Sequence, residues 1–180
     1  IRDLLIGQPP KDFDVVTDAT PDEIRQLFRR VRLVGRRFRL AHVRIGREVI
    51  EVATYRGNAL EADEDSENDR HDDRFVFNNV FGARDQDALR RDFTVNCLYY
   101  DPIDDRLVDY VGGLDDLRSR TLRLIGDPET RLVEDPVRML RAVRFKAKLG
   151  FVFETQLAQL IPKMAPHLCT ASSARLFDEV

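Results

Sequence analysis

The spacing of the apolar residues changes along this chain, and that change restricts the fold more than any other feature. Before residue 125 the apolar residues alternate with polar ones over short segments, such as 38–45 and 48–55, which is typical of strands. From Pro128 onward they recur at helical spacing. We therefore predict an α+β domain over residues 1–127 and an all-helical domain over 128–180.

Individual helices carry their own start and stop signals. Thr20 is placed as an N-cap, Pro21 at the first helical position and Glu23 to close a capping box, so we expect a helix to about residue 30. The run after Pro136 predicts a long amphipathic helix that ends at Gly150. These signals support the division into a mixed part and a helical part.

Composition limits the class of protein. Hydrophobic residues make up 43% and charged residues 34%, and no apolar run approaches the roughly 20 residues of a membrane span. The chain starts at Ile1 without Met inside a helix-like run, so we expect a fragment of a longer protein. Cys97 and Cys169 lie far apart, which favours two reduced cysteines in a cytoplasmic protein over a disulfide or a reactive thiol.

The charges are unevenly distributed although the net charge is only −3. Residues 24–47 hold nine arginines and no acid, whereas residues 61–74 hold eight acids and two arginines. Arginine suits phosphate because its planar fork donates two hydrogen bonds at once, so the basic stretch favours a nucleic-acid partner. A genome rich in G and C would also favour arginine over lysine. Residues 58–74 have almost no apolar side chain, and we predict a mobile loop there.

Asp12 and Asp14 form the strongest candidate site. On a strand, residues i and i+2 point to the same face, which brings two carboxylates together, with Phe13 expected to anchor the strand beneath them. Magnesium prefers such oxygen ligands, and two ions can clamp an in-line displacement at phosphorus. Glu51, between two apolar residues of a later predicted strand, is the candidate third ligand. The alternative for Glu51 is a salt bridge to one of the arginines.

Three ordered blocks resemble a known family. They are residues 1–14, which end in Lys-Asp-Phe-Asp, residues 90–96, Arg-Arg-Asp-Phe-Thr-Val-Asn, and residues 134–145, which begin Glu-Asp-Pro-Val-Arg. Together they resemble the class II nucleotidyltransferases of the polymerase-beta-like superfamily, which comprise bacterial poly(A) polymerases and CCA-adding tRNA nucleotidyltransferases. The family's glycine pair would precede Ile1. The resemblance implies a head domain with a mixed sheet flanked by helices, followed by a helical neck, both truncated.

The resemblance also implies roles for individual residues. Asp12, Asp14 and Asp92 would be catalytic, and a two-metal magnesium site would be held by Asp12, Asp14 and Glu51. The residues implied in binding the nucleotide, with ATP as substrate, are Arg2, Arg91, Asn96, Asp135, Arg138, Arg141 and Arg144. Asp92 would orient an arginine or the ribose hydroxyls, because a carboxylate cannot bind phosphate directly. Alternatives stay open: Asp92 could cap a helix or pair with Arg90, and the residues after 134 could form a solvated helical face.

One stretch distinguishes the two branches of this family. Residues 33–43, with Gly-Arg-Arg-Phe at their centre, resemble the signature of the poly(A) polymerase branch. The resemblance implies addition of AMP from ATP to RNA 3′ ends with release of pyrophosphate. The alternatives are a CCA-adding tRNA nucleotidyltransferase and a non-catalytic RNA-binding fragment. A phosphohydrolase of the HD type would need a His-Asp cluster, which His42, His71 and His167 do not supply.

Overall fold

The computed structural model describes residues 1–35, 39–57 and 81–180, and it separates the chain into two compact units. The first unit joins Ile1–Pro9 to Arg91–Val180, and the second is Pro10–Arg90. The loop predicted over 58–74 and the central Arg36-Arg37-Phe38 of the basic stretch lie outside the described residues. The boundary near residue 127 stays a prediction about evolutionary domains, whereas the two units are a division by packing.

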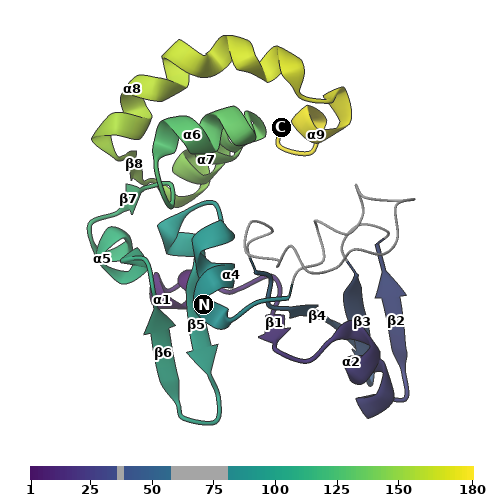
Figure 1. The fold of residues 1–180 in the computed structure, drawn as a ribbon. Helices are drawn as coiled ribbons and strands as arrows, with labels where there is room; N and C mark the ends of the chain where they lie inside the picture. The colour runs from purple at the N-terminus through teal and green to yellow at the C-terminus, as the bar shows by residue number, and fades with distance from the viewer. Residues whose placement is uncertain (36–38, 58–80) are drawn as a thin grey trace, which may run out of the picture. The chain divides into compact units, whose positions relative to one another are not determined.

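The second unit is built on a mixed four-stranded sheet in the order β1-β4-β3-β2 (Figure 1). Strand β1 runs parallel to β4, and the other pairs are antiparallel. The turn between β3 and β4 contains Gly46, whose φ of +62° is one that glycine adopts without strain. The elements are β1 Asp14–Thr17, α2 Pro21–Leu27, β2 Val31–Val34, β3 Leu40–Ile45, β4 Glu48–Thr54 and α4 Arg84–Arg90.

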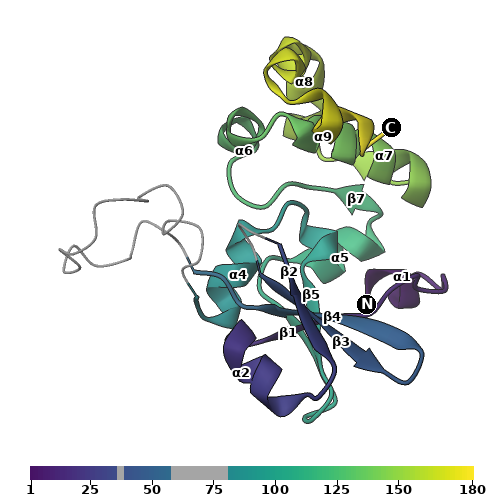
Figure 2. The same ribbon diagram turned by 90° about the vertical axis from the view of Figure 1, so that its right-hand side faces the viewer.

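The two faces of this sheet differ in burial. One face packs against α2, where Ile24 forms a core with Ala41, Val43 and Val52 (Figure 2). Because side chains alternate along a strand, the intervening residues point to the opposite face. That face carries the register partners Asp14, Glu51, His42 and Arg32.

Helix α2 begins as the sequence predicts. The Thr20 side chain accepts from the Glu23 backbone N–H and the Glu23 carboxylate accepts from the Thr20 N–H, so both halves of the capping box are present. The helix ends at Leu27, earlier than expected, because Phe28 has extended backbone angles. Of the apolar residues on this helix, Ile24 is buried whereas Leu27 is 73% exposed.

The first unit contains two small two-stranded sheets and most of the helices. Its buried core joins residues on both sides of position 127, such as Phe93 and Leu124 with Leu132 and Met139. The elements are α1 Arg2–Leu5, η2 Thr94–Asn96, β5 Leu98–Asp101, β6 Arg106–Asp109, α5 Gly113–Arg118, β7 Thr121–Leu122, α6 Pro128–Glu134, α7 Val137–Leu149, β8 Val152–Phe153, α8 Thr155–Met164, η3 Ala165–Thr170 and α9 Ser173–Phe177.

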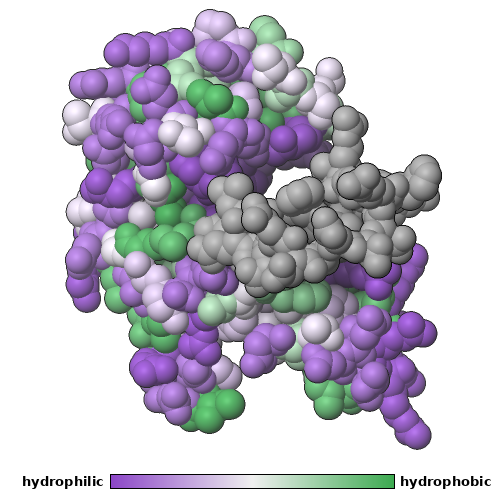
Figure 3. All heavy atoms as spheres, viewed as in Figure 1, coloured by the Kyte–Doolittle hydropathy of each residue, from purple (hydrophilic) through white to green (hydrophobic). Residues whose placement is uncertain are grey.

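The predicted long helix is confirmed as α7, and Gly150 ends it with a φ of +67°. The part after residue 128 is not purely helical, because β8 pairs with β7 in a short parallel ladder. Neither cysteine forms a disulfide, and Cys97 is buried whereas Cys169 is exposed. Within the described ranges, no helix combines the length and apolar character needed to cross a bilayer. In both units the surface seen in Figure 3 is mainly hydrophilic, with apolar side chains scattered over it.

Candidate functional site

The first candidate site is a carboxylate pair on the open face of the second unit's sheet. Asp14 on β1 is the register partner of Glu51 on β4. Partners in a parallel ladder point to the same face, at a strand spacing of about 4.8 Å, so the two carboxylates are neighbours. Both residues are exposed, and the next residue on each strand differs, since Val52 after Glu51 is buried whereas Val15 after Asp14 is 43% exposed. An adjacent pair of like charges is costly until a cation joins it.

Asp12 lies two residues before Asp14 but outside the strand, which begins at Asp14. It is exposed, and so is Phe13, with 67% of its surface accessible. The expectation that Phe13 anchors the strand beneath the carboxylates is therefore wrong, because its ring is exposed and no described helix or strand of its unit buries it. The side chain of neither aspartate has a hydrogen bond or ion pair with another described residue.

Glu51 has a partner on the other side. His42 is its register partner on β3, and His42 Nε2 lies 3.5 Å from Glu51 Oε1. The alternative for Glu51 is a salt bridge to an arginine, but its partner in the structure is a histidine. The Glu51 side chain remains 52% exposed. Among the described residues, no three His, Cys, Asp or Glu side chains are grouped so that they alone could hold a metal ion.

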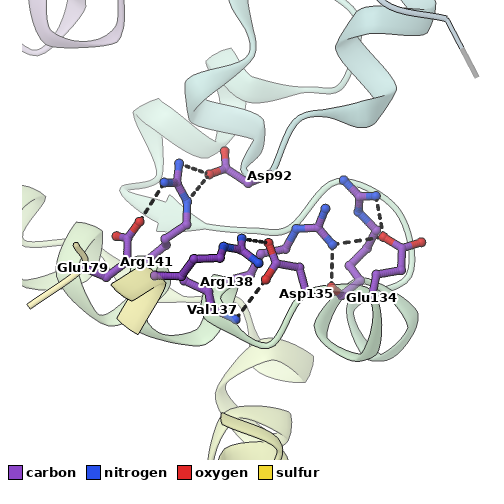
Figure 4. Close-up of polar contacts among 9 residues, drawn as sticks. Asp92, Glu134, Asp135, Val137, Arg138, Arg141 and Glu179 are labelled. Carbon is purple, nitrogen blue, oxygen red and sulfur yellow. Dashed lines mark hydrogen bonds and ion pairs between the residues drawn. The ribbon is translucent and has the colours of Figure 1, made fainter. Parts of the chain in front are cut away.

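A second candidate site, described by itself, is an arginine cluster in the first unit. Arg141 on α7 donates to Asp92 Oδ2 from Nε at 2.9 Å and from Nη2 at 2.6 Å. Its Nη1 donates to Glu179 Oε1 at 2.9 Å. Figure 4 shows the Arg141 guanidinium held between these two carboxylates. Of the roles considered for Asp92, the structure therefore supports the orientation of another arginine.

The network extends on both sides of Arg141. Asn96 donates weakly to Asp92 Oδ1 at 3.4 Å and accepts a short hydrogen bond from Arg2 Nη1. On the other side, Arg144 Nη2 lies 2.8 Å from Glu179 Oε2. Five residues that the sequence predicts for nucleotide binding or catalysis thus lie in one connected cluster. They are Arg2, Asp92, Asn96, Arg141 and Arg144.

A single aromatic ring lies at the centre of this cluster. The guanidinium carbons of Arg2, Arg141 and Arg144 lie 5.2, 5.8 and 5.2 Å from the centroid of the Phe145 ring. Phe145 is itself held edge-on by the buried Phe93, at 5.6 Å between centroids. Each cation within about 6 Å of a ring face is attracted by its quadrupole, so Phe145 attracts all three arginines.

Burial and neighbouring charges shift the pKa of Arg141 and that of Arg131 in opposite directions. Burial lowers the pKa of Arg141, but Asp92 and Glu179 outweigh burial and raise this pKa above its ordinary value. Arg131 on α6 shows the opposite balance, since burial and the neighbouring Arg138 lower its pKa more than Glu134 and Asp92 raise it. Arg141 is thus a permanently charged group at the centre of the network.

Asp135 and Arg138 lie apart from that network and have other partners. Asp135 is not on the long helix as expected. It follows the end of α6 in extended conformation, and α7 begins two residues later. Its Oδ2 accepts from Arg175 Nη2 at 2.7 Å. Arg138 Nη1 donates to Glu134 Oε2 at 3.0 Å and to the Arg131 carbonyl at 2.6 Å.

Arg91 is fixed by a buried tyrosine. Its Nε donates to the Tyr99 hydroxyl at 3.0 Å, and its guanidinium carbon lies 5.0 Å from the centroid of the Tyr99 ring. The Arg91 carbonyl accepts from Arg131 Nη2 at 2.8 Å. These contacts fix the position of Arg91 directly before Asp92.

Several partners escaped the sequence analysis: Phe145, Glu179, Arg175, Glu134, Tyr99 and His42. Phe145 and Glu134 lie within a block that carried the family resemblance, but spacing gave them no role. Glu179 is 38 positions from Arg141, and no local signal connects the two.

Comparison with known proteins shows the family of this chain. Residues 1–123 match the family model described as the poly A polymerase head domain, and the chain belongs to this family. Poly(A) polymerase I of Salmonella typhi is 55% identical over 185 residues, which cover 99% of this chain. A CCA-adding enzyme of Oceanobacillus iheyensis is 38% identical over 171 residues, or 93% of the chain. The chain spans 39% and 40% of the length of these two relatives.

The fold agrees with solved structures. The CCA-adding enzyme of Bacillus stearothermophilus in complex with CTP has a TM-score of 0.84 and 31% identity, over 99% of this chain and 40% of that one. A tRNA nucleotidyltransferase complexed with a primer tRNA and an incoming ATP analogue has a TM-score of 0.74 and 29% identity, over 99% of this chain and 48% of that one. The predicted α+β nucleotidyltransferase fold is therefore confirmed.

Proposed function

We propose that the protein carrying this chain adds AMP from ATP to RNA 3′ ends without a template and releases pyrophosphate. The observation that carries the proposal is the exposed pair Asp14 and Glu51 on one sheet face, with Asp12 just before it. Carboxylates on an open face, without cationic partners for Asp12 and Asp14 among the described residues, suit a site for hard cations and phosphate.

Asp12, Asp14 and Glu51 fit magnesium by their chemistry, since all three offer exposed carboxylate oxygens. The described residues include no group of three side chains that could coordinate a metal ion by themselves. Magnesium is usually coordinated by one or two carboxylates together with waters and substrate phosphates, so it does not require such a group. When bound, the ion would lower the cost of bringing a hydroxyl oxygen and a phosphate together.

The reaction is an in-line displacement at the α-phosphorus of ATP. The RNA 3′ oxygen bonds to that phosphorus, the bond from the phosphorus to the bridging oxygen of the β-phosphate breaks, and pyrophosphate leaves. The hydroxyl proton passes to solvent. The protein contributes mainly position and charge to such a transfer.

The arginine cluster supplies charge for the triphosphate. Arg144 is 43% exposed on its side chain and uses Nη2 for Glu179, while Arg141 is 34% exposed. Arg2 extends the same cluster through Asn96. We assign these three arginines to the phosphates, and Asp92 to holding Arg141 in place. Arg91 and Asn96 are assigned to the ribose side.

Asp135 and Arg138 are assigned to the base. A carboxylate offers acceptors and a guanidinium offers donors, which together can read the hydrogen-bonding edge of one base and reject another. Arg175 holds Asp135, and Glu134 holds Arg138, so both groups are fixed before the nucleotide arrives. Such pre-organisation is what selection between ATP and CTP requires.

The poly(A) branch is favoured over CCA addition by two findings. The identity of 55% to Poly(A) polymerase I exceeds the 38% to a CCA-adding enzyme over nearly the same span. The arginine-rich residues 33–43 suit sequence-tolerant contact with an RNA backbone, which an enzyme that extends many 3′ ends needs.

The test is nucleotide choice by the full-length protein that carries this chain. Each nucleoside triphosphate is incubated separately with an unstructured RNA and with a tRNA that lacks its 3′ end, and the products are resolved by length. Long A tails on both RNAs support the proposal. Addition of C and then A to the tRNA alone would establish the alternative, and no addition from any triphosphate would support a non-catalytic RNA-binding role.

A further inference from the structure

We propose that the exposed face of β2 and β3 binds the RNA backbone just upstream of the reacting 3′ end, through Arg30, Arg32 and Arg44. This inference rests on the proposed function and specifies where its acceptor lies. It concerns the second unit alone. The ligand class is a single-stranded RNA backbone, recognised by its phosphodiester charge.

The strand register places one row of polar residues across all four strands of the sheet. Asp14 on β1 pairs with Glu51 on β4, and Glu51 pairs with His42 on β3. His42 in turn pairs with Arg32 on β2. Register partners share a face, so this row runs from two acids through a histidine to an arginine on one side of the sheet.

A second row adds two more arginines to the same face. Arg44 lies two residues after His42 on β3, and so points to the same side. The Arg44 N–H donates to the Arg30 carbonyl at 2.9 Å, which continues the ladder beyond the end of β2 and sets Arg30 opposite Arg44. The face therefore changes from acidic over β1 and β4 to basic over β3 and β2.

These arginines are available to a ligand. Arg30, Arg32 and Arg44 are all exposed, and none has an ion pair with any residue of the ranges that the structure covers. Like charges directly opposite each other, as in Arg30 and Arg44, destabilise a sheet. The core of this unit lies on the opposite face of the sheet, where Ala41 and Val43 are buried against α2. The basic face contributes nothing to that core.

The neighbouring carboxylates identify the occupant and its direction. The RNA 3′ hydroxyl must reach Asp14 and Glu51 for transfer, so the phosphates that precede it continue toward β3 and β2. Three strand spacings separate Asp14 from Arg32, or about 14 Å, which is a few nucleotides of a single strand. Arginine contacts to phosphate carry no sequence information, which suits an acceptor of any sequence.

The test uses the full-length protein with Arg32→Ala and Arg44→Ala, separately and together. We expect the KM for a long RNA primer to rise several-fold, with the KM for ATP unchanged. The plot of log affinity against log salt should lose about 0.7 units of slope for each phosphate contact removed. With a primer too short to reach β2, Arg32→Ala should behave as wild type.

The matched control is Arg25→Ala. Arg25 is an exposed arginine of the same unit on α2, the helix that covers the opposite face. The Arg25→Ala variant loses the same charge as Arg32→Ala, and we expect its KM for RNA to equal that of the wild type. Equal effects of Arg25→Ala and Arg32→Ala would reduce the basic face to general electrostatic attraction and overturn the proposed path.

The outcomes separate this inference from the proposed function. If the wild type adds A tails and the Arg32 and Arg44 variants have unchanged RNA kinetics, the path is wrong and the function stands. If these variants raise the KM for ATP instead, the face binds the nucleotide and the path is also wrong. If wild type adds no nucleotide but the variants still lose RNA affinity at equilibrium, the backbone path stands and the catalytic proposal fails. Unchanged RNA affinity combined with lost binding of an acidic protein would assign the face to that partner instead.

Discussion

The two candidate sites, the carboxylate pair of the second unit and the arginine cluster of the first, differ in how their charges are balanced. In the second unit, Asp14 and Glu51 are adjacent like charges on an exposed sheet face, and His42 is the one basic partner of Glu51 within the described ranges. In the first unit, Arg141 is held by Asp92 and Glu179, and three arginines surround Phe145. The negative charge of the carboxylate pair is left for a bound cation to balance. In the arginine cluster, most of the positive charge is balanced by carboxylates of the same unit.

This difference in charge balance predicts how the carboxylate pair and the arginine cluster each affect the stability of the fold. A cluster of opposite charges with good geometry is pre-organised, and it stabilises the fold as it awaits an anion. Adjacent carboxylates destabilise the fold until a cation arrives. Substitutions in the two sites should therefore change stability in opposite directions, even where both reduce activity.

The largest effect on stability is expected for Arg141→Met. This change removes the partner of Asp92, 15% exposed, and of Glu179, 8% exposed on the side chain. Removing the hydrogen bonds that Arg141 donates to these two carboxylates should lower the free energy of unfolding by about 2 kcal/mol. Urea unfolding of the full-length protein measures it.

A surface pair provides the control for that change. Arg118 and Asp115 form an ion pair with side chains 75% and 84% exposed, and Arg118→Met should cost less than about 0.5 kcal/mol. Equal losses for the two variants would mean that the arginine cluster is no more than a solvated charged face.

A smaller effect is expected for Phe145→Leu. Leucine keeps the apolar contact with Phe93 but removes the ring faced by Arg2, Arg141 and Arg144. With each cation–π contact contributing about 0.5–1 kcal/mol, the KM for ATP should rise roughly tenfold, with little change in the KM for RNA.

The aromatic character can be separated from packing by a second variant. Phe145→Tyr keeps the ring and should restore the KM for ATP to near the wild-type value. If leucine and tyrosine behave alike in steady-state kinetics, the ring has no role in positioning the arginines.

The smallest effect has the opposite sign. Asp14→Asn removes one of two adjacent carboxylates, so without divalent cations it should raise the free energy of unfolding by a few tenths of a kcal/mol. Magnesium should stabilise the wild type and not this variant in a thermal melt. A loss of stability in metal-free buffer would show that Asp14 has a structural role, and the contrast between the two sites would fail.

Local signals were sufficient for part of this fold. The capping box at Thr20 and the glycine that ends α7 were predicted because their contacts lie within a few residues. Strand β2 and helix α5 were missed. Val31–Val34 is short and is defined by its pairing with β3, and α5 starts after Gly112 in left-handed conformation with no side-chain cap.

The site was predicted as a set of residues but not as a geometry. The family blocks name Asp92 and Arg141, yet only the folded chain brings them within 2.6 Å across 49 positions. The error on Phe13 has a similar cause, because alternation shows which residues share a face and not whether anything covers it. The polar row from Asp14 to Arg32 likewise depends on register, which the sequence did not reveal.

The most direct test of the central claim is the single-turnover rate of AMP transfer from ATP to an RNA primer, compared between the wild type and Asp14→Asn of the full-length protein. If Asp14 is part of the catalytic centre, the rate should fall by about a thousandfold or more, while the variant remains folded and still binds RNA. A rate within tenfold of the wild type would contradict the assignment of the carboxylate pair as the catalytic site.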